Sequence, residues 1–284
     1  MRVFWLRRNW KQIFTVALVG VAVVVGTLAY HVYKSHEKKP VTPSEYASII
    51  LSVNTVQSVE RPENIAYNVL TEYGKVPQDD IILLMDWRKD ATFNNFKKAI
   101  NEIAERVTEN SVTTISLFGH GTGTGIRDLA TFEEFDREID KITKGKVIVL
   151  VDTCGPYTTP LNYGPCPRIV IQQAGPDEEA KGHHSCMLTN MYMALTGPDK
   201  KYTFPPYVVH IYRFADLDNN GRVSVFETFK FGENQILSYD IERGKRGARH
   251  PQLWDPENIA ETTYIANILV RYQGENVGPL YHGE

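Results

Sequence analysis

The sequence has little that would indicate a nucleic-acid partner or a fold held together by disulfides. Its 31 lysine and arginine residues are balanced by 34 aspartate and glutamate residues, for a formal net charge of −3. The basic residues are scattered and form no stripe interleaved with aromatic residues, so the charge pattern gives no reason to propose nucleic-acid binding. There are three cysteines, without C-x-x-C spacing, and no internal repeat. The 284 residues, 42% hydrophobic and 23% charged, are enough for one large α/β domain with a substantial core.

The N-terminus is the least ordinary part of the chain. Residues 13–30 (IFTVALVGVAVVVGTLAY) carry no charge and have the length that a transmembrane helix needs. A small excess of basic residues on the N-terminal side favours a cytoplasmic N-terminus. We therefore predict a cytoplasmic tail at 1–12, a transmembrane anchor at 13–33 and a linker at 34–45, with the remaining chain outside the cytoplasm. The alternative is a cleaved signal peptide and a secreted protein, but the apolar run exceeds the usual signal core of about 7–15 residues.

Beyond the linker, apolar runs typical of buried strands alternate with amphipathic helical patterns. The strand-like runs are 48–53, 81–85, 114–118, 147–151, 168–172 and 207–214. The helical patterns lie at 63–73, 93–107, 132–142 and 185–195. Thr131 and Glu134 have the spacing of a capping box at the start of the third helix. Such alternation implies parallel strands covered by helices on both faces, which predicts an α/β sandwich with a mostly parallel sheet of about six strands.

Two of the predicted strands run directly into reactive residues. The third ends in FGHGTGTG, which places His120 between glycines, and the fourth ends in VDTCG, which contains Cys154. Because one helix separates these strands, a right-handed crossover makes them parallel and brings both ends to the edge where α/β sheets form sites. We predict that His120 deprotonates or polarises the Cys154 thiol. The backbone N–H groups of Gly121 and Cys154 are the predicted oxyanion hole.

These two blocks, in this order, resemble the caspase/legumain clan of cysteine peptidases, which includes metacaspases and legumain-like proteases and transamidases. The resemblance covers roughly residues 46–270, and the segments 63–86 and 90–107 are similar to the clan's elements before the histidine strand. It implies a caspase-like three-layer α/β/α sandwich over residues 46–284. It also implies an endopeptidase that cleaves protein or peptide substrates through an acyl-enzyme, with Cys154 as nucleophile and His120 as general acid and base. With the anchor predicted above, this enzyme would be attached to the membrane.

The resemblance further implies where a substrate would bind. Asp152 matches a position that lines the primary specificity pocket in metacaspases and legumains, and a carboxylate there favours Arg, Lys or Asn as the P1 residue. Asn54 matches the orienting asparagine of legumains loosely. Asp177 and Glu178 lie after the fifth strand, where clan members place substrate-binding loops, and they could shape a pocket; a solvated acidic loop is the favoured interpretation. The chain departs from the clan after Cys154, where it reads Gly-Pro-Tyr and many relatives read x-Ser-Gly.

A second motif, residues 216–227 (DLDNNGRVSVFE), has the spacing of a calcium-binding loop. The ligand positions 1, 3, 5, 7, 9 and 12 fall on Asp216, Asp218, Asn220, the Arg222 carbonyl, Ser224 and Glu227. Gly221 allows the sharp turn, and a helix is expected after Ser224. The pattern before the loop is that of a strand, unlike an EF-hand. The sequence thus predicts a Ca²⁺ site, and the alternative is a polar turn that caps a helix.

Other interpretations stay open on the sequence alone. A catalytically inactive, calcium-stabilised scaffold or interaction module would keep the fold without the reaction. A transpeptidase would use the same dyad, because a thioester intermediate can pass to water or to an amine. Cys166 and Cys186 could form a disulfide that leaves Cys154 reduced. The basic stretch 243–255 is predicted to be a surface loop.

Overall fold

The structure is a computed structural model, and the part of it described here is limited to certain residues. These are 43–53, 62–155, 158–175, 178, 191–192, 194–195, 215–218, 220–242 (backbone only from 237) and 250–266. The predicted anchor at 13–33, the predicted strand at 207–214 and most of the predicted helix at 185–195 lie outside them. Among the described residues, no helix has both the length and the apolar character needed to span a bilayer.

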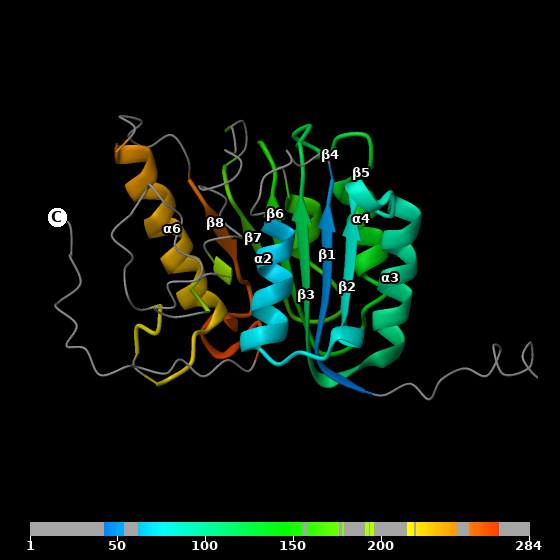
Figure 1. The fold of residues 1–284 in the computed structure, drawn as a ribbon, viewed down its shortest axis with the longest axis horizontal. Helices are drawn as coiled ribbons and strands as arrows, with labels where there is room; N and C mark the ends of the chain where they lie inside the picture. The colour runs from blue at the N-terminus through cyan, green and yellow to red at the C-terminus, as the bar shows by residue number, and fades with distance from the viewer. Residues whose placement is uncertain are drawn as a thin grey trace, which may run out of the picture. The chain divides into compact units, whose positions relative to one another are not determined.

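A six-stranded, mostly parallel sheet forms the centre of the described fold (Figure 1). Its strands, in spatial order, are β2 (Ile81–Met85), β1 (Ser44–Ser52), β3 (Val107–Phe118), β6 (Lys146–Asp152), β7 (Arg168–Gln172) and β8 (Gln252–Trp254). All neighbouring pairs are parallel except β7 and β8, which are antiparallel. The predicted α/β class with a mostly parallel sheet is therefore confirmed.

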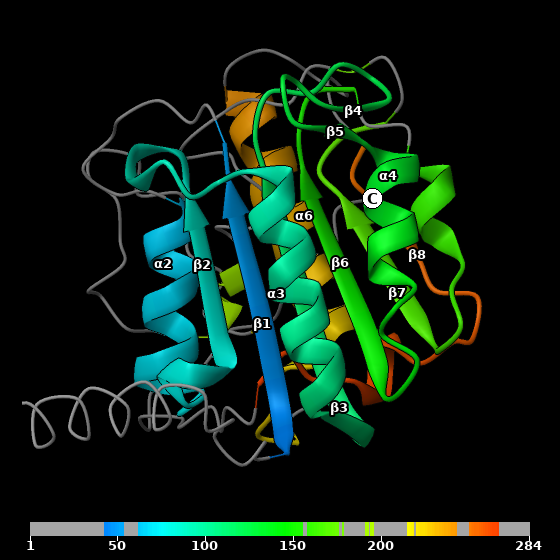
Figure 2. The same cartoon turned by 90° about the vertical axis from the view of Figure 1, so that its right-hand side faces the viewer.

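Helices cover both faces of the sheet (Figures 1 and 2). One face packs against α2 (Pro62–Asn68), its π-helical continuation η1 (Val69–Tyr73) and α6 (Val225–Glu242). The other packs against α3 (Phe93–Arg106) and α4 (Phe132–Ile139). The alternation of strand side chains divides the core: Ile50 belongs to the first layer, whereas Ile49 and Leu51 belong to the second. Strands buried on both faces explain why their sequences are continuously apolar.

Local signals in the sequence account for the helices next to the site. The Thr131 hydroxyl accepts the Glu134 N–H and the Glu134 carboxylate accepts the Thr131 N–H, so the predicted capping box is confirmed at the start of α4. The apolar faces of α3 and α4 meet through Phe96 and Phe135, whose rings pack edge to face with centroids 4.9 Å apart. This contact fixes the crossover between β3 and β6, on which the relation of the two strand ends depends.

Two predicted boundaries were wrong. Strand β1 begins at Ser44, inside the predicted linker 34–45, because Ser44 is buried and hydrogen-bonds Asp80 and Ser111 across the lower end of the sheet. The stretch 243–255 is not entirely loop, since residues 252–254 form β8. Three residues paired on one edge are too few to produce a periodic pattern in a sequence.

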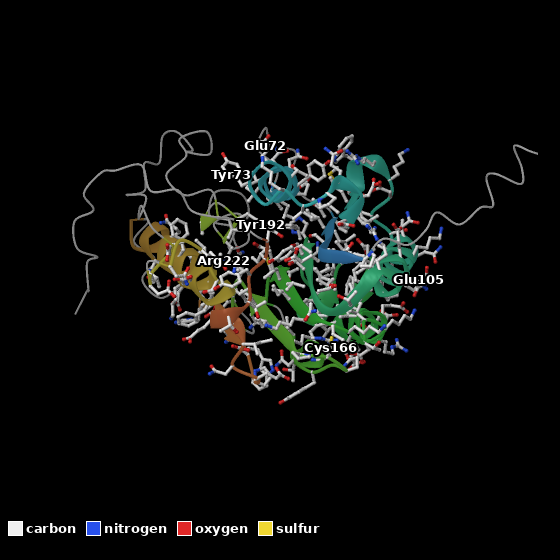
Figure 3. All side chains as sticks on the ribbon, turned by 90° about the horizontal axis from the view of Figure 1, so that it is seen from below. Glu72, Tyr73, Glu105, Cys166, Tyr192 and Arg222 are labelled. Carbon is white, nitrogen blue, oxygen red and sulfur yellow. The ribbon has the colours of Figure 1, made fainter. Side chains whose placement is uncertain are left out.

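Cys166 and Tyr192 are buried on opposite sides of the sheet (Figure 3). Cys166 is not disulfide-bonded and its thiol donates to the Ile142 carbonyl at 3.3 Å, so the bridge to Cys186 considered above is not formed. The Tyr192 hydroxyl lies 2.9 Å from Ser116 Oγ on β3. Burial raises the pKa of Tyr192 to about 12, against the opposing effect of its hydrogen bond to Ser116. Both groups are therefore neutral structural elements of the core.

Candidate functional site

The histidine and cysteine segments leave the sheet side by side. Strands β3 and β6 are parallel, and their last residues, Phe118 and Asp152, are paired in register. Beyond them the Gly119 N–H donates to the Asp152 carbonyl at 3.3 Å. The prediction that these two strands are parallel neighbours with both C-terminal ends at one edge is confirmed. That edge is at the top of Figure 1, where the short strands β4 (Gly125–Ile126) and β5 (Ala130–Thr131) also lie.

The segment after His120 folds into a small hairpin that orients its backbone. The Arg127 N–H donates to the His120 carbonyl at 2.8 Å, and the Thr122 N–H donates to the Gly125 carbonyl at 3.0 Å. Gly121 lies opposite Ile126 in the non-hydrogen-bonded pair between these two bonds. In such a pair the residue's own N–H points away from its partner strand. The Gly121 amide is thus directed out of the hairpin, and the His120 side chain is exposed.

The backbones of Gly121 and Cys154 are in direct contact. A methyl group placed on Gly121 would overlap the Cys154 carbonyl oxygen, and it would lie 3.0 Å from both the carbonyl carbon and the amide nitrogen of Cys154. No side chain other than hydrogen fits there, so the approach requires glycine at 121. The fold thereby brings the residue after His120 against the backbone of Cys154, although the two are far apart in the chain.

The remaining sequence-predicted site residues fall into two groups. Cys154 is half-buried and not in a disulfide, and Asp152, at the end of β6, is only 8% exposed. Both lie at the same edge of the sheet as the His120 loop. Asn54 and Asp177 lie outside the described residues, so their positions are not part of the site as it stands.

A polar layer that was not predicted from the sequence lies beside the cysteine segment. The Thr158 hydroxyl donates to the buried Gln172 side chain, whose amide donates to the Gln252 side chain at 2.6 Å. The Glu178 carbonyl accepts the Gly155 N–H at 2.6 Å, one residue beyond Cys154. These contacts join the ends of β6, β7 and β8. The glutamines at the end of the apolar run of β7 are the one sequence signal for these contacts, because the residues that they bond are distant in sequence.

The loop 216–227 gathers three carboxylates. One oxygen from each of Asp216, Asp218 and Glu227 lies within 4.8 Å of the others. Asp216 accepts the N–H groups of Asn220 at 3.0 Å and Gly221 at 2.8 Å, which curls the loop around it. Glu227 reaches back from α6, which begins at Val225 as predicted, and accepts the Leu217 N–H at 2.7 Å.

Contacts with the rest of the fold fix this loop in place. The Arg222 guanidinium lies 3.6 Å from the centre of the Tyr264 ring. Ser224 is buried, and its hydroxyl donates to Glu227 at 3.0 Å. An oxygen-only donor set of this kind suits a hard cation such as Ca²⁺.

No protein-family model matches the chain, and no curated protein sequence gives a significant match. Among solved structures, the chain is similar to a protein of Geobacter sulfurreducens, with a TM-score of 0.44 and 11% identity over 79% of this chain and 99% of that one. It is also similar to caspase-1 of Spodoptera frugiperda, with a TM-score of 0.43 and 10% identity over 83% of this chain and 94% of that one. Likenesses at this level identify no family.

Proposed function

We propose that the protein is a cysteine endopeptidase of caspase-like architecture, with Cys154 as nucleophile and His120 as general acid and base. The observation that carries this proposal is the contact between Gly121 and the Cys154 backbone, which places a histidine loop against a cysteine at the C-terminal edge of a parallel sheet. A lone cysteine or a lone histidine is usually structural. The two together, each following a strand and joined through backbone, have the arrangement of an activated nucleophile.

The proposed reaction balances through this pair. His120 takes the proton from the Cys154 thiol, and the sulfur attacks the carbonyl carbon of the scissile peptide bond. The Gly121 and Cys154 amides donate to the resulting oxyanion. When the C–N bond breaks, His120 gives the proton to the departing amine and a thioester remains. Water then attacks the thioester, His120 accepts its proton and returns one to the thiolate, and the acid product leaves.

We propose a basic residue or asparagine as the P1 residue of the substrate. Asp152 supports this, because a carboxylate two residues before the nucleophile, at 8% exposure, would favour a cationic or amide-bearing side chain nearby. An acidic P1 residue would bring two negative charges together in a poorly solvated place, which is unfavourable.

Acyloxymethyl-ketone probes bearing Arg, Lys, Asn or Asp at P1 test the dyad and the pocket together. The full-length protein is expected to be labelled by the Arg, Lys or Asn probe and at least about 10-fold more slowly by the Asp probe. Cys154→Ala should abolish labelling, and His120→Ala should slow it by a factor of about 10² or more. Cys166→Ala is the matched control, since Cys166 is the other thiol of the described residues and is buried; this variant should label at the wild-type rate.

Labelling that survives Cys154→Ala would contradict the assignment of the nucleophile. A folded wild-type protein that no probe labels would favour the inactive scaffold instead. Where labelling is found, digestion of a peptide in the presence of a second peptide's free amine separates hydrolysis from transpeptidation by the mass of the product.

We also propose that the loop 216–227 binds Ca²⁺ through Asp216, Asp218, Asn220, the Arg222 carbonyl, Ser224 and Glu227. The support is the convergence of three carboxylates at 4.8 Å or less, each with lone pairs beyond those used by the backbone N–H groups. Three like charges this close repel one another unless a cation neutralises them. The site lies on the α6 side of the fold and takes no part in the proposed reaction.

Millimolar Ca²⁺ is expected to stabilise the full-length protein by about 1–2 kcal/mol relative to EDTA, if the Kd is that of a weak extracellular site. Thermal unfolding should register this as a rise of about 2–4 °C in Tm, and Mg²⁺ should give less. Glu227→Gln should remove the response, whereas Glu233→Gln on the same helix should keep it, because Glu233 pairs with Lys230 and lies outside the loop. Identical unfolding curves in Ca²⁺ and EDTA would identify the motif as a helix-capping turn.

A further inference from the structure

We propose that Glu178 is a positioning residue that fixes the peptide unit between Cys154 and Gly155. Through that unit it fixes the relative placement of the two backbone amides proposed as oxyanion donors. The inference rests on the proposed function and adds a residue to it. Glu178 is half-buried in the segment after β7, and the sequence indicated it only as a pocket or loop residue beside Asp177.

The peptide unit after Cys154 is held from two sides. Its carbonyl oxygen faces Gly121, where only a hydrogen atom fits, and its N–H, which belongs to Gly155, donates to the Glu178 carbonyl at 2.6 Å. Because the C=O and N–H of a trans peptide point in opposite directions, the His120 loop and Glu178 lie on opposite sides of this unit. Gly155 itself has φ +49°, a left-handed conformation that glycine adopts without strain.

The Glu178 side chain anchors the carbonyl that makes this contact. One carboxylate oxygen accepts the Gly175 N–H at 2.7 Å and the His250 N–H at 2.8 Å, and the other pairs with the His250 ring. Bonds from backbone N–H groups to a carboxylate are among the stronger hydrogen bonds. Burial by itself would raise the pKa of Glu178, but the bonds from His250 and Gly175 outweigh it and lower the pKa, so the group is a carboxylate at neutral pH.

Glu178 therefore joins three segments: the one after the nucleophile, the one after β7 at Gly175, and the one before β8 at His250. With the Gly155 N–H turned toward Glu178, the donors left for the oxyanion are the Gly121 and Cys154 amides. Without the anchor, this peptide unit could rotate and its carbonyl would leave the contact with Gly121. The Gly121 and Cys154 amides, which lie on either side of that contact, would then lose their relative placement. Attack on a peptide carbonyl needs both amides in place to bind the oxyanion, whereas alkylation of the thiol at a saturated carbon creates no oxyanion.

Two reactions of the same thiol separate positioning from general damage to the fold. Glu178→Ala is expected to lower kcat for a fluorogenic peptide amide by about 10- to 100-fold with little change in KM. The rate of Cys154 alkylation by iodoacetamide should stay within about twofold. Glu178→Gln should retain hydrolysis within about threefold, because its amide oxygen can still accept both backbone N–H groups. Glu178→Asp is the second test, for the case in which Glu178→Ala does not fold. It keeps the charge but shortens the side chain, so it should show the loss of hydrolysis expected for the alanine variant.

Several outcomes would overturn the proposal. Unchanged hydrolysis in both Glu178→Ala and Glu178→Asp would show that the contacts of the Glu178 side chain have no effect on the reaction. Equal losses of hydrolysis and alkylation would show a structural role alone. A wild-type protein without peptide hydrolysis, whose alkylation does not depend on His120, would reject the proposed function first and this inference with it, and that result is visible before any Glu178 variant is made.

Discussion

Gly121→Ala is expected to lower kcat/KM for peptide hydrolysis by about 10²- to 10³-fold while the protein still folds. The added methyl group would overlap the Cys154 carbonyl oxygen, which is backbone and cannot turn aside as a flexible side chain would. Either the His120 loop or the Cys154 loop must move, and both carry proposed reacting groups. Because overpacking at one contact costs about 1–3 kcal/mol, a domain of this size should remain folded. The measurement is kcat/KM beside Tm for the variant and the wild type.

Gly123→Ala is the matched control, because it adds the same methyl group two residues along the same loop. Among the described residues beyond its chain neighbours, the atom nearest to that methyl group is the Gly155 carbonyl oxygen at 3.8 Å, although φ of +84° makes alanine strained there. It should therefore lose about 1 kcal/mol of stability and keep hydrolysis within about threefold. Equal activity losses in both variants would show that the loop is merely fragile, and full activity in Gly121→Ala would contradict the proposed geometry.

The parts of this fold that the sequence predicts well are those set by neighbouring residues. The runs 81–85 and 168–172 coincide with β2 and β7, and the capping box at Thr131 and Glu134 marks the start of α4. Buried parallel strands are apolar along their whole length and a helix start needs a side-chain acceptor, so a few adjacent residues carry each signal. The first half of β3 was missed, since Thr108, Glu109 and Asn110 are exposed there and give no apolar run.

The candidate site divides in the same way. His120 and Cys154 follow strands, and the crossover rule brings strand ends together, so their neighbourhood could be predicted from the chain. The contact between Glu178 and His250 could not be predicted, because His250 lies 72 residues away and its stretch is an ordinary basic loop in sequence. A contact between loops depends on the whole fold, and no local pattern encodes it. For the same reason the pocket residues Asn54 and Asp177 stay predictions, outside the described residues.

Arg168→Ala is expected to destabilise the fold by about 3 kcal/mol, without touching any proposed reacting group. In sequence Arg168 is a charged residue at the start of an apolar strand, yet it is 1% exposed. Its guanidinium donates to Asp136 on α4 at 2.7 Å and to Asp140, the C-cap residue of α4, at 2.9 Å. It also donates to the Tyr163 carbonyl at 2.8 Å, beyond η4 (Thr159–Asn162). Removing it leaves a cavity, an unsatisfied carbonyl and two carboxylates facing each other.

Urea unfolding at two pH values tests this explanation as well as its size. Burial and the Asp140 charge raise the pKa of Asp136, and Arg168 opposes them; without the arginine the pKa should rise further. A carboxyl group whose pKa is higher in the folded than in the unfolded state gains a proton on folding, so its unfavourable contribution disappears as the pH falls. The deficit of Arg168→Ala should therefore be smaller near about pH 4 than near about pH 7.

Arg137→Ala is the matched control for this variant, because Arg137 is an exposed arginine on α4, next to Asp136. It should stay within about 0.5 kcal/mol of the wild type at both pH values. Arg168→Met fills most of the volume without donating hydrogen bonds, so its loss of stability should lie between those of Arg168→Ala and Arg137→Ala. A deficit in Arg168→Ala no larger than that of Arg137→Ala, or one that grows on acidification, would show that the arginine does not neutralise the carboxylates of α4.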